Sequence, residues 1–81
     1  MTINLNTKFN LGDQVYVAET YEDYWANSEP SIVTDVFIKI NNSTTTVLYR
    51  LKQGEFFDVV SEYFIFATYD ECKQWCEEHN K

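Results

Sequence analysis

Hydrophobic and polar residues alternate through much of the chain, a pattern that is typical of half-buried β-strands. This alternation predicts strands at residues 14–18, 32–40, 44–52 and 56–60. The apolar run at residues 63–66 fits either a fifth strand or a single helical turn. Asn41-Asn42-Ser43 and Gln53-Gly54-Glu55 supply turn residues between consecutive strands. The chain is therefore predicted to form a series of hairpins.

The strand at residues 32–40 has apolar residues on both faces. Its predicted core face consists of Ile32, Val36, Ile38 and Ile40, with Thr34 filling the gap. The opposite face carries Val33 and Phe37 beside Asp35 and Lys39. Two explanations fit these outward apolar groups. They are buried beneath the C-terminal helix through Trp75, or they form an exposed edge that pairs with another chain or a homodimer partner.

Residues 19–31 show neither a helical nor a strand period and are predicted to form a long loop. Such loops are uncommon in compact domains and are often functional. An acidic aromatic cluster lies within it: Tyr21, Glu22, Asp23, Tyr24 and Trp25. Because Tyr and Trp are rigid, amphipathic and enriched in interface hot spots, this cluster is the predicted binding site. The alternative is that Tyr24 and Trp25 fold inward and cover the core.

A helix is predicted over residues 69–79. Thr68 and Glu71 have the spacing of a capping box, in which the Thr hydroxyl accepts from the amide three residues on and the Glu side chain reaches back to the cap. The apolar stripe that would face the sheet consists of Tyr69, Cys72, Trp75 and Cys76.

The length of 81 residues is that of one domain, and residues 1–81 are expected to form a single unit. Hydrophobic residues make up 44% of the chain and aromatic residues 17%, which favours a strand-rich core. Five short strands followed by one helix predict a mainly β (α+β) fold. The expected architecture is a small five-stranded antiparallel barrel, or a strongly bent sheet, whose C-terminal helix covers one open end.

Thirteen acidic and six basic residues give a formal net charge of −7. This charge repels phosphate backbones and anionic lipids, so nucleic acid and membranes are unfavourable partners. It favours a partner protein with a basic surface, although solubility alone accounts for the same charge. The N-terminus lacks a basic start followed by an apolar run, and no segment approaches the roughly 20 apolar residues of a membrane span. A cytoplasmic location is expected.

The stretch Phe9-Asn10-Leu11-Gly12-Asp13-Gln14-Val15-Tyr16-Val17 resembles the F-x-x-G-D-x-V-Y-V opening of small SH3-like barrels found in many short bacterial and phage proteins. Its Gly-Asp-x-Val also resembles the entry to KOW-type modules. Tyr49, Glu62 and the run Ile65-Phe66-Ala67-Thr68-Tyr69-Asp70-Glu71 are similar to the second half of the same proteins.

This resemblance implies an SH3-like barrel of prokaryotic or phage origin, in a family whose members mostly lack an assigned biochemistry. In peptide-binding SH3 domains, the connection between the first two strands lines a groove for proline-rich or basic ligands. KOW-type modules that bind RNA carry basic residues near the Gly-Asp turn, where this chain has only Lys8.

Cys72, Cys76 and His79 would share one helix face, and thiolate and imidazole are zinc ligands. Structural zinc sites usually draw ligands from two elements, and no second cluster is present. We therefore interpret the cysteines as core thiols and expect no metal or other cofactor. The neighbouring Glu77 and Glu78 disfavour a nucleophilic thiolate. Because the sequence also lacks phosphate-binding, zinc-protease and nucleophile-elbow motifs, no enzymatic activity is expected.

Two classes of function follow from the sequence. The first is a non-catalytic acidic protein-interaction module with a basic partner. Its specific form is a phage-encoded inhibitor that occupies the cationic groove of a host nucleic-acid-binding protein. The alternative is a small-barrel nucleic-acid-binding protein whose exposed aromatic side chains stack on bases. Both are compatible with a homo-oligomer.

Overall fold

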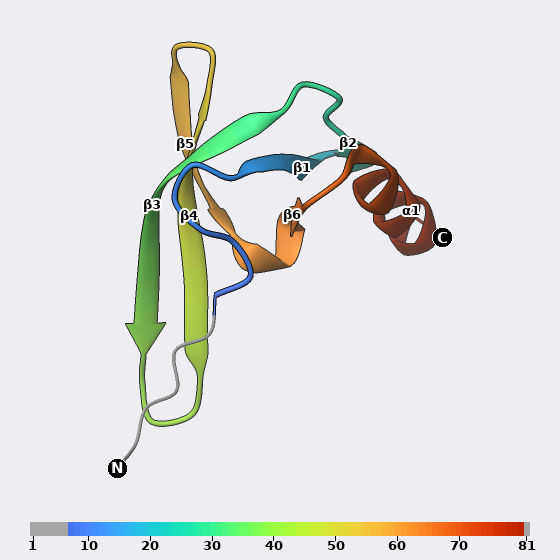
Figure 1. Ribbon diagram of the computed structural model, residues 1–81. Helices are drawn as coiled ribbons and strands as arrows, with labels where there is room; N and C mark the ends of the chain where they lie inside the picture. The colour runs from blue at the N-terminus through green and yellow to red at the C-terminus, as the bar shows by residue number, and fades with distance from the viewer. Residues whose placement is uncertain (1–6, 81) are drawn as a thin grey trace.

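The computed structural model describes residues 7–80, which form an antiparallel sheet of six strands and one C-terminal helix (Figure 1). The strands are β1 (Gln14–Tyr21), β2 (Asp23–Ala26), β3 (Ser31–Ile40), β4 (Thr45–Gln53), β5 (Phe56–Ser61) and β6 (Ile65–Phe66). A 3-10 turn, η1 (Glu62–Phe64), precedes β6, and helix α1 spans Tyr69–His79. The strand order is β2-β1-β3-β4-β5, and β6 pairs with β1. The predicted antiparallel β architecture and the helix at residues 69–79 are confirmed.

Both alternatives for residues 63–66 are realised in succession. The helical turn η1 occupies the first part, and the two-residue strand β6 follows it. Because β6 pairs with β1, the turn returns the chain from the far edge of the sheet to its first strand. No helix within residues 7–80 has the length and apolar character that a membrane span requires.

The predicted long loop at residues 19–31 is wrong. β1 continues to Tyr21, the chain reverses at Glu22, and β2 returns antiparallel beside β1. Glu22 has a φ of 63°, in the left-handed region that a tight reversal requires. Irregular structure is confined to residues 27–30. The sequence pattern concealed this hairpin because each of its faces carries both polar and aromatic residues, so no apolar alternation is visible.

A β-bulge changes the faces that the sequence predicted for β3. The register with β4 shifts between Val33 and Asp35, so Thr34 interrupts the alternation of side chains. As a result Val33, which was predicted to face outward, is only 2% exposed, whereas Ile32, predicted to lie in the core, is 42% exposed. Val36 follows the bulge and again packs against the core.

The prediction for the end of β3 is also only partly correct. Ile38 and Ile40 share a face with Val36 but stay exposed, because β3 and β4 project beyond the rest of the molecule as a two-stranded arm (Figure 1). The predicted burial of outward groups beneath the helix through Trp75 is wrong. Phe37 is exposed on the arm, and α1 packs against β1, β2 and β6.

Two hydrophobic clusters hold the fold together. The first lies inside the curved sheet and comprises Phe9, Val15, Val17, Val33, Tyr49, Leu51 and Ile65. The second lies between the β1–β2 hairpin and α1, where Ala18, Cys72 and Cys76 are buried. Successive side chains of β1 point to opposite faces, so Val15 and Val17 pack in the first cluster and Tyr16 and Ala18 in the second. Strand β1 therefore contributes to both clusters.

The Thr68 half of the predicted capping box is present at the N-terminus of α1. Thr68 has extended backbone angles, and its hydroxyl accepts a hydrogen bond from the amide of Glu71 at 3.2 Å. The first turn carries Asp70 and Glu71, whose negative charges suit the positive end of the helix dipole.

Thr68→Ala is expected to lower the free energy of unfolding by about 1 kcal/mol while preserving the fold, because it leaves the Glu71 amide without its acceptor. Urea denaturation followed by circular dichroism measures this loss. Thr68→Ser keeps the hydroxyl and serves as the control. Equal stability of Thr68→Ala and the wild type would show that the cap contributes nothing.

Candidate functional site

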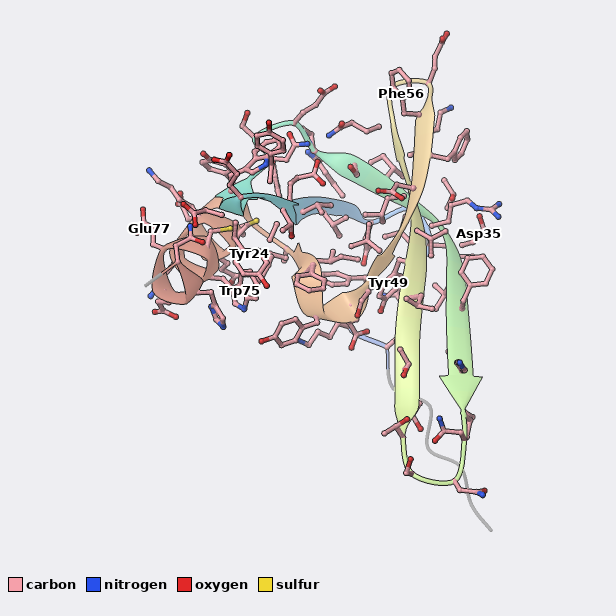
Figure 2. All side chains as sticks on the ribbon, turned by 180° about the vertical axis from the view of Figure 1, so that it is seen from behind. Tyr24, Asp35, Tyr49, Phe56, Trp75 and Glu77 are labelled. Carbon is pink, nitrogen blue, oxygen red and sulfur yellow. The ribbon has the colours of Figure 1, made fainter. Side chains whose placement is uncertain are left out.

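The β1–β2 hairpin sends alternate side chains to opposite faces, and Tyr24 lies on the face toward α1 (Figure 2). The Tyr24 ring centroid is 4.8 Å from that of Trp75, in an edge-to-face arrangement. Asn80 donates to the Tyr24 carbonyl at 2.7 Å and accepts from the Tyr24 amide at 2.8 Å. These two bonds satisfy the outward amide and carbonyl groups of Tyr24 at the edge of β2, as pairing with a neighbouring strand would. Tyr24 is thus part of the packing between hairpin and helix.

The other face of the hairpin carries Tyr21 and Asp23, which are paired across the strands, and then Glu19 and Trp25, which are also paired. Tyr21 is 77% exposed and Trp25 is 47% exposed. Glu22 is exposed at the turn. The structure therefore brings Tyr21, Asp23 and Trp25 of the predicted site together with Glu19. We call these four residues the acidic aromatic face.

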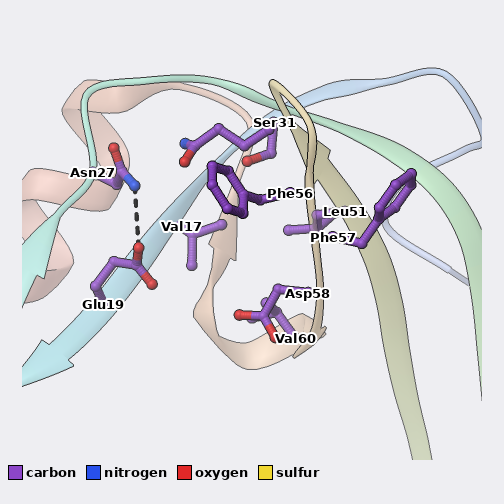
Figure 3. A pocket seen from close by; sticks show the side chains of 10 residues that line it. Val17, Glu19, Asn27, Ser31, Leu51, Phe56, Phe57, Asp58 and Val60 are labelled. Carbon is purple, nitrogen blue, oxygen red and sulfur yellow. Dashed lines mark hydrogen bonds between the residues drawn. The ribbon is translucent and has the colours of Figure 1, made fainter.

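The acidic aromatic face leads into an open cleft of about 230 Å³ between β1 and β5 (Figure 3). The cleft is lined by Val17, Glu19, Asn27, Ser31, Leu51, Gln53, Phe56, Phe57, Asp58 and Val60. Val17 and Glu19 lie on the same face of β1 as Tyr21, so strand alternation carries the surface from the hairpin tip into the cleft. Val17 and Leu51 are buried residues of the sheet core, which gives the cleft an apolar base.

Two carboxylates and one aromatic ring dominate the walls of the cleft. Glu19 accepts a hydrogen bond from the side-chain amide of Asn27 at 3.1 Å, which fixes one wall. Asp58 extends from β5 into the cleft opposite, and the Phe56 ring, on a residue that is 79% exposed, lies over Val17 (Figure 3). None of the ten lining residues is Lys, Arg or His. The arrangement suits a ligand that combines a cationic group with an apolar part.

The sequence interpretation missed Phe56, Asp58 and Asn27 as members of this surface. One signal was available for the first of them. Phe56 and Phe57 are adjacent on a strand, where successive side chains point to opposite faces, so both could be buried only if both faces of the strand were covered. The proximity of Asp58 to Glu19 had no signal, because it depends on how β5 curves back toward β1.

The two cysteines lie in the core between α1 and the hairpin, as free thiols. Burial, followed by the effect of the neighbouring Cys76, raises the pKa of Cys72 to about 12. Burial also raises the pKa of Cys76. Both side chains are therefore protonated near neutral pH, whereas a nucleophile or a metal ligand requires the thiolate.

His79 lies outside the thiol cluster. Its ring stacks on Trp75 at a centroid distance of 4.0 Å, and its Nδ1 is 2.8 Å from the Trp75 carbonyl oxygen, to which it donates. Within the described part of the chain, no group of three or more His, Cys, Asp and Glu residues is arranged to hold a metal ion. The structure thus keeps Cys72 and Cys76 together in the core and places His79 apart from them, against Trp75.

A hydrogen-bond network joins the N-terminal segment to η1. The Tyr49 hydroxyl accepts from the Phe9 amide at 3.2 Å and donates to the Glu62 carboxylate at 2.5 Å, and the Lys8 amide donates to the same carboxylate oxygen at 3.1 Å. Burial, followed by the hydrogen bond to Glu62, raises the pKa of Tyr49 to about 12. Tyr49 and Phe9 belong to the core, and the network ties the N-terminal segment to η1 at the edge of that core.

Comparisons with protein-family models, curated proteins and solved structures gave no match to this chain. The resemblance to small SH3-like barrels therefore stays an expectation from the sequence. The function is inferred below from the residues of the surface itself.

Proposed function

We propose that the chain is a non-catalytic protein-interaction module whose acidic aromatic face and adjoining cleft bind a cationic segment of another protein. The observation that carries this proposal is the continuity of the surface. Strand alternation aligns Tyr21, Trp25 and Glu19 with the cleft wall that Asp58 faces. An arginine or lysine side chain can place its apolar stem on the exposed rings and its charge between the two carboxylates.

The charge of the chain supports the same partner class. A net charge of −7 accelerates association with a cationic surface, and the exposed Asp23 and Glu22 add to the field at the hairpin tip. The specific form of the proposal is an inhibitor, of phage origin by resemblance, that occupies a groove in which a host protein otherwise binds nucleic acid. Carboxylates then take the positions of phosphates.

The proposed fold is an SH3-like barrel. Two features support it: η1 followed by a short strand that pairs with β1, and the hairpin formed by β1 and β2 before the three-stranded meander β3-β4-β5. In that topology the β1–β2 hairpin is the connection associated with peptide binding in SH3 domains.

Titration with a deca-arginine peptide, followed by NMR, tests the proposed function. Trp25→Ala is expected to weaken binding by about 30-fold, which corresponds to about 2 kcal/mol for a hot spot. The double variant Asp23→Lys/Asp58→Lys is expected to weaken binding by at least about tenfold, because it reverses charge on the site itself.

The matched control is Glu77→Lys/Glu78→Lys, which changes the net charge by the same amount. Glu77 lies on the far side of α1 from Phe56 and the cleft (Figure 2). If both double variants weaken binding equally, only the overall field of the protein acts and the site assignment is wrong. Shifts of NMR signals outside the hairpin and the cleft would contradict it as well.

A specific observation supports the nucleic-acid alternative. The outward face of β3-β4-β5 gathers three of the six cationic residues, Lys39, Arg50 and Lys52, beside exposed Phe37 and Phe57. The cations lie over the rings, at 5.6 Å for Arg50 on Phe37 and 5.8 Å for Lys52 on Phe57. Repeating the titration with a single-stranded oligonucleotide distinguishes the two classes, since binding through phosphates is lost between about 50 and 200 mM salt.

A further inference from the structure

The edge of β3 facing away from β4 has no strand partner over most of its length, within residues 7–80. β1 pairs with β3 only at Ser31 and Ile32, whereas β4 pairs with β3 as far as Ile40. Residues 35–40 therefore form one edge of the two-stranded arm that projects from the molecule in Figure 1. Their outward amide and carbonyl groups are available to another strand.

This edge is apolar on both of its faces. Phe37 is 39% exposed on one face, and Ile38 and Ile40 are 37% and 48% exposed on the other. Edge strands are normally protected by bulges, proline or charged side chains such as Lys. The bulge of β3 lies before this segment, and the segment contains no proline and only two charged residues, Asp35 and Lys39. A strand that paired here would cover backbone groups and apolar side chains together.

The two charges on the segment select the partner. Asp35 and Lys39 lie two positions on either side of Phe37 and carry opposite signs. If two copies of the segment pair antiparallel about Phe37, Asp35 of each copy lies opposite Lys39 of the other, and the two Phe37 rings lie opposite each other. On the other face, Val36 lies opposite Ile38. Opposite charges and aromatic pairs directly across a sheet are stabilising.

Other arrangements of the same two strands lose this complementarity. Moving the antiparallel register by two residues in either direction breaks both ion pairs and places Phe37 opposite a charged residue, either Lys39 or Asp35. Parallel pairing in register places Asp35 beside Asp35 and Lys39 beside Lys39. The charge pattern therefore distinguishes one register and one orientation, and that arrangement is symmetric, as a two-fold dimer requires.

We propose that the chain forms a two-fold symmetric homodimer through antiparallel pairing of residues 35–39 of β3. The sheet of one copy then continues into the sheet of the other. The occupant of the edge is a second copy of this chain, because the segment is complementary to itself: antiparallel pairing about Phe37 places Asp35 of each copy opposite Lys39 of the other. This interface lies on the arm and does not include the acidic aromatic face.

Sedimentation equilibrium on the full chain, over a range of concentrations, tests this dimer. The wild type is expected to show a monomer–dimer equilibrium. Asp35→Lys and Lys39→Asp are each expected to weaken dimerisation by about tenfold or more, because each places like charges opposite one another twice in the symmetric interface. The double variant Asp35→Lys/Lys39→Asp restores both ion pairs and is expected to dimerise like the wild type.

An equimolar mixture of the two single variants gives the sharpest result. The Asp35→Lys chain then carries two positive charges and the Lys39→Asp chain two negative charges at the interface, so the mixture is expected to form a heterodimer although neither variant dimerises alone. Arg50→Gln serves as the control, since it removes the 3.4 Å ion pair of Asp35 within the monomer without changing the edge charges. Circular dichroism verifies that each variant is folded.

A wild type that stays monomeric at all concentrations would overturn the proposal. Dimerisation of both single variants at wild-type strength would overturn it as well, because the dimer would then use another surface. The double variant Asp35→Lys/Lys39→Asp has the same net charge as the wild type, so its binding of deca-arginine reports separately on the acidic aromatic face. Failure of the dimer and failure of the proposed function are therefore distinguishable.

Discussion

Trp75→Ala is expected to lower the free energy of unfolding by about 3 kcal/mol, a large part of the stability of a domain this small. Trp75 is the centre of an aromatic cluster in which its ring lies 4.8 Å from Tyr24, 5.8 Å from Phe64 and 5.7 Å from Phe66. Its removal leaves a cavity between α1 and the β1–β2 hairpin. Urea denaturation monitored by circular dichroism measures the loss.

Trp25→Ala is the matched control, because it removes the same side chain from a position that is 47% exposed. Its expected cost in stability is below about 1 kcal/mol, with the main effect on partner binding. If Trp25→Ala destabilises the protein as much as Trp75→Ala, then Trp25 belongs to the packing of the fold and the acidic aromatic face loses its principal residue.

Tyr49→Phe is expected to lower the free energy of unfolding by about 1–3 kcal/mol at neutral pH. The hydroxyl accepts from the Phe9 amide and donates to the Glu62 carboxylate. Its removal leaves the Phe9 amide without this acceptor, while the Glu62 carboxylate keeps the hydrogen bond from the Lys8 amide. Tyr21→Phe is the control, since Tyr21 is 77% exposed. A loss for Tyr49→Phe no greater than that for Tyr21→Phe would exclude a stabilising role for this network.

The raised pKa of Tyr49 also predicts a dependence of stability on pH. The folded protein binds the phenolic proton more tightly than the unfolded chain, with a pKa of about 12 against 10.0. The stabilisation is therefore complete below pH 10 and is lost as the pH rises toward 12, at about 1.4 kcal/mol per pH unit. Urea denaturation at pH 8 and pH 11 measures the slope. Tyr49→Phe is expected to lose stability less steeply over this interval than the wild type.

The features that the sequence predicted best are those that depend on near neighbours. The cap at Thr68, the helix Tyr69–His79 and the turn at Asn41 are determined by residues within a few positions. The Asn41 side chain, for instance, accepts from the amides of Ser43 and Thr44 and so closes the β3–β4 turn by local hydrogen bonds. Such interactions form in the same way whatever the rest of the chain does.

The candidate site was predicted only in part. The sequence identified the stretch from Tyr21 to Trp25 because its aromatic and acidic composition is unusual. It did not predict that Tyr24 packs against the helix while Trp25 faces solvent. That difference follows from the alternation of side chains in the β1–β2 hairpin, which the sequence pattern did not reveal. Nor did it find Asp58, which approaches Glu19 from the last long strand of the sheet.

The sequence by itself determined the helix, the turn at Asn41 and the strands outside residues 19–31, and it showed that the chain is acidic and rich in aromatic residues. Only the tertiary structure decided which residues are buried. The bulge at Thr34 moves Val33 inward and Ile32 outward, and α1 packs on Tyr24 while Trp25 stays 47% exposed. The physical reason is that local conformation follows from neighbouring residues, whereas burial depends on which distant segment packs opposite a side chain.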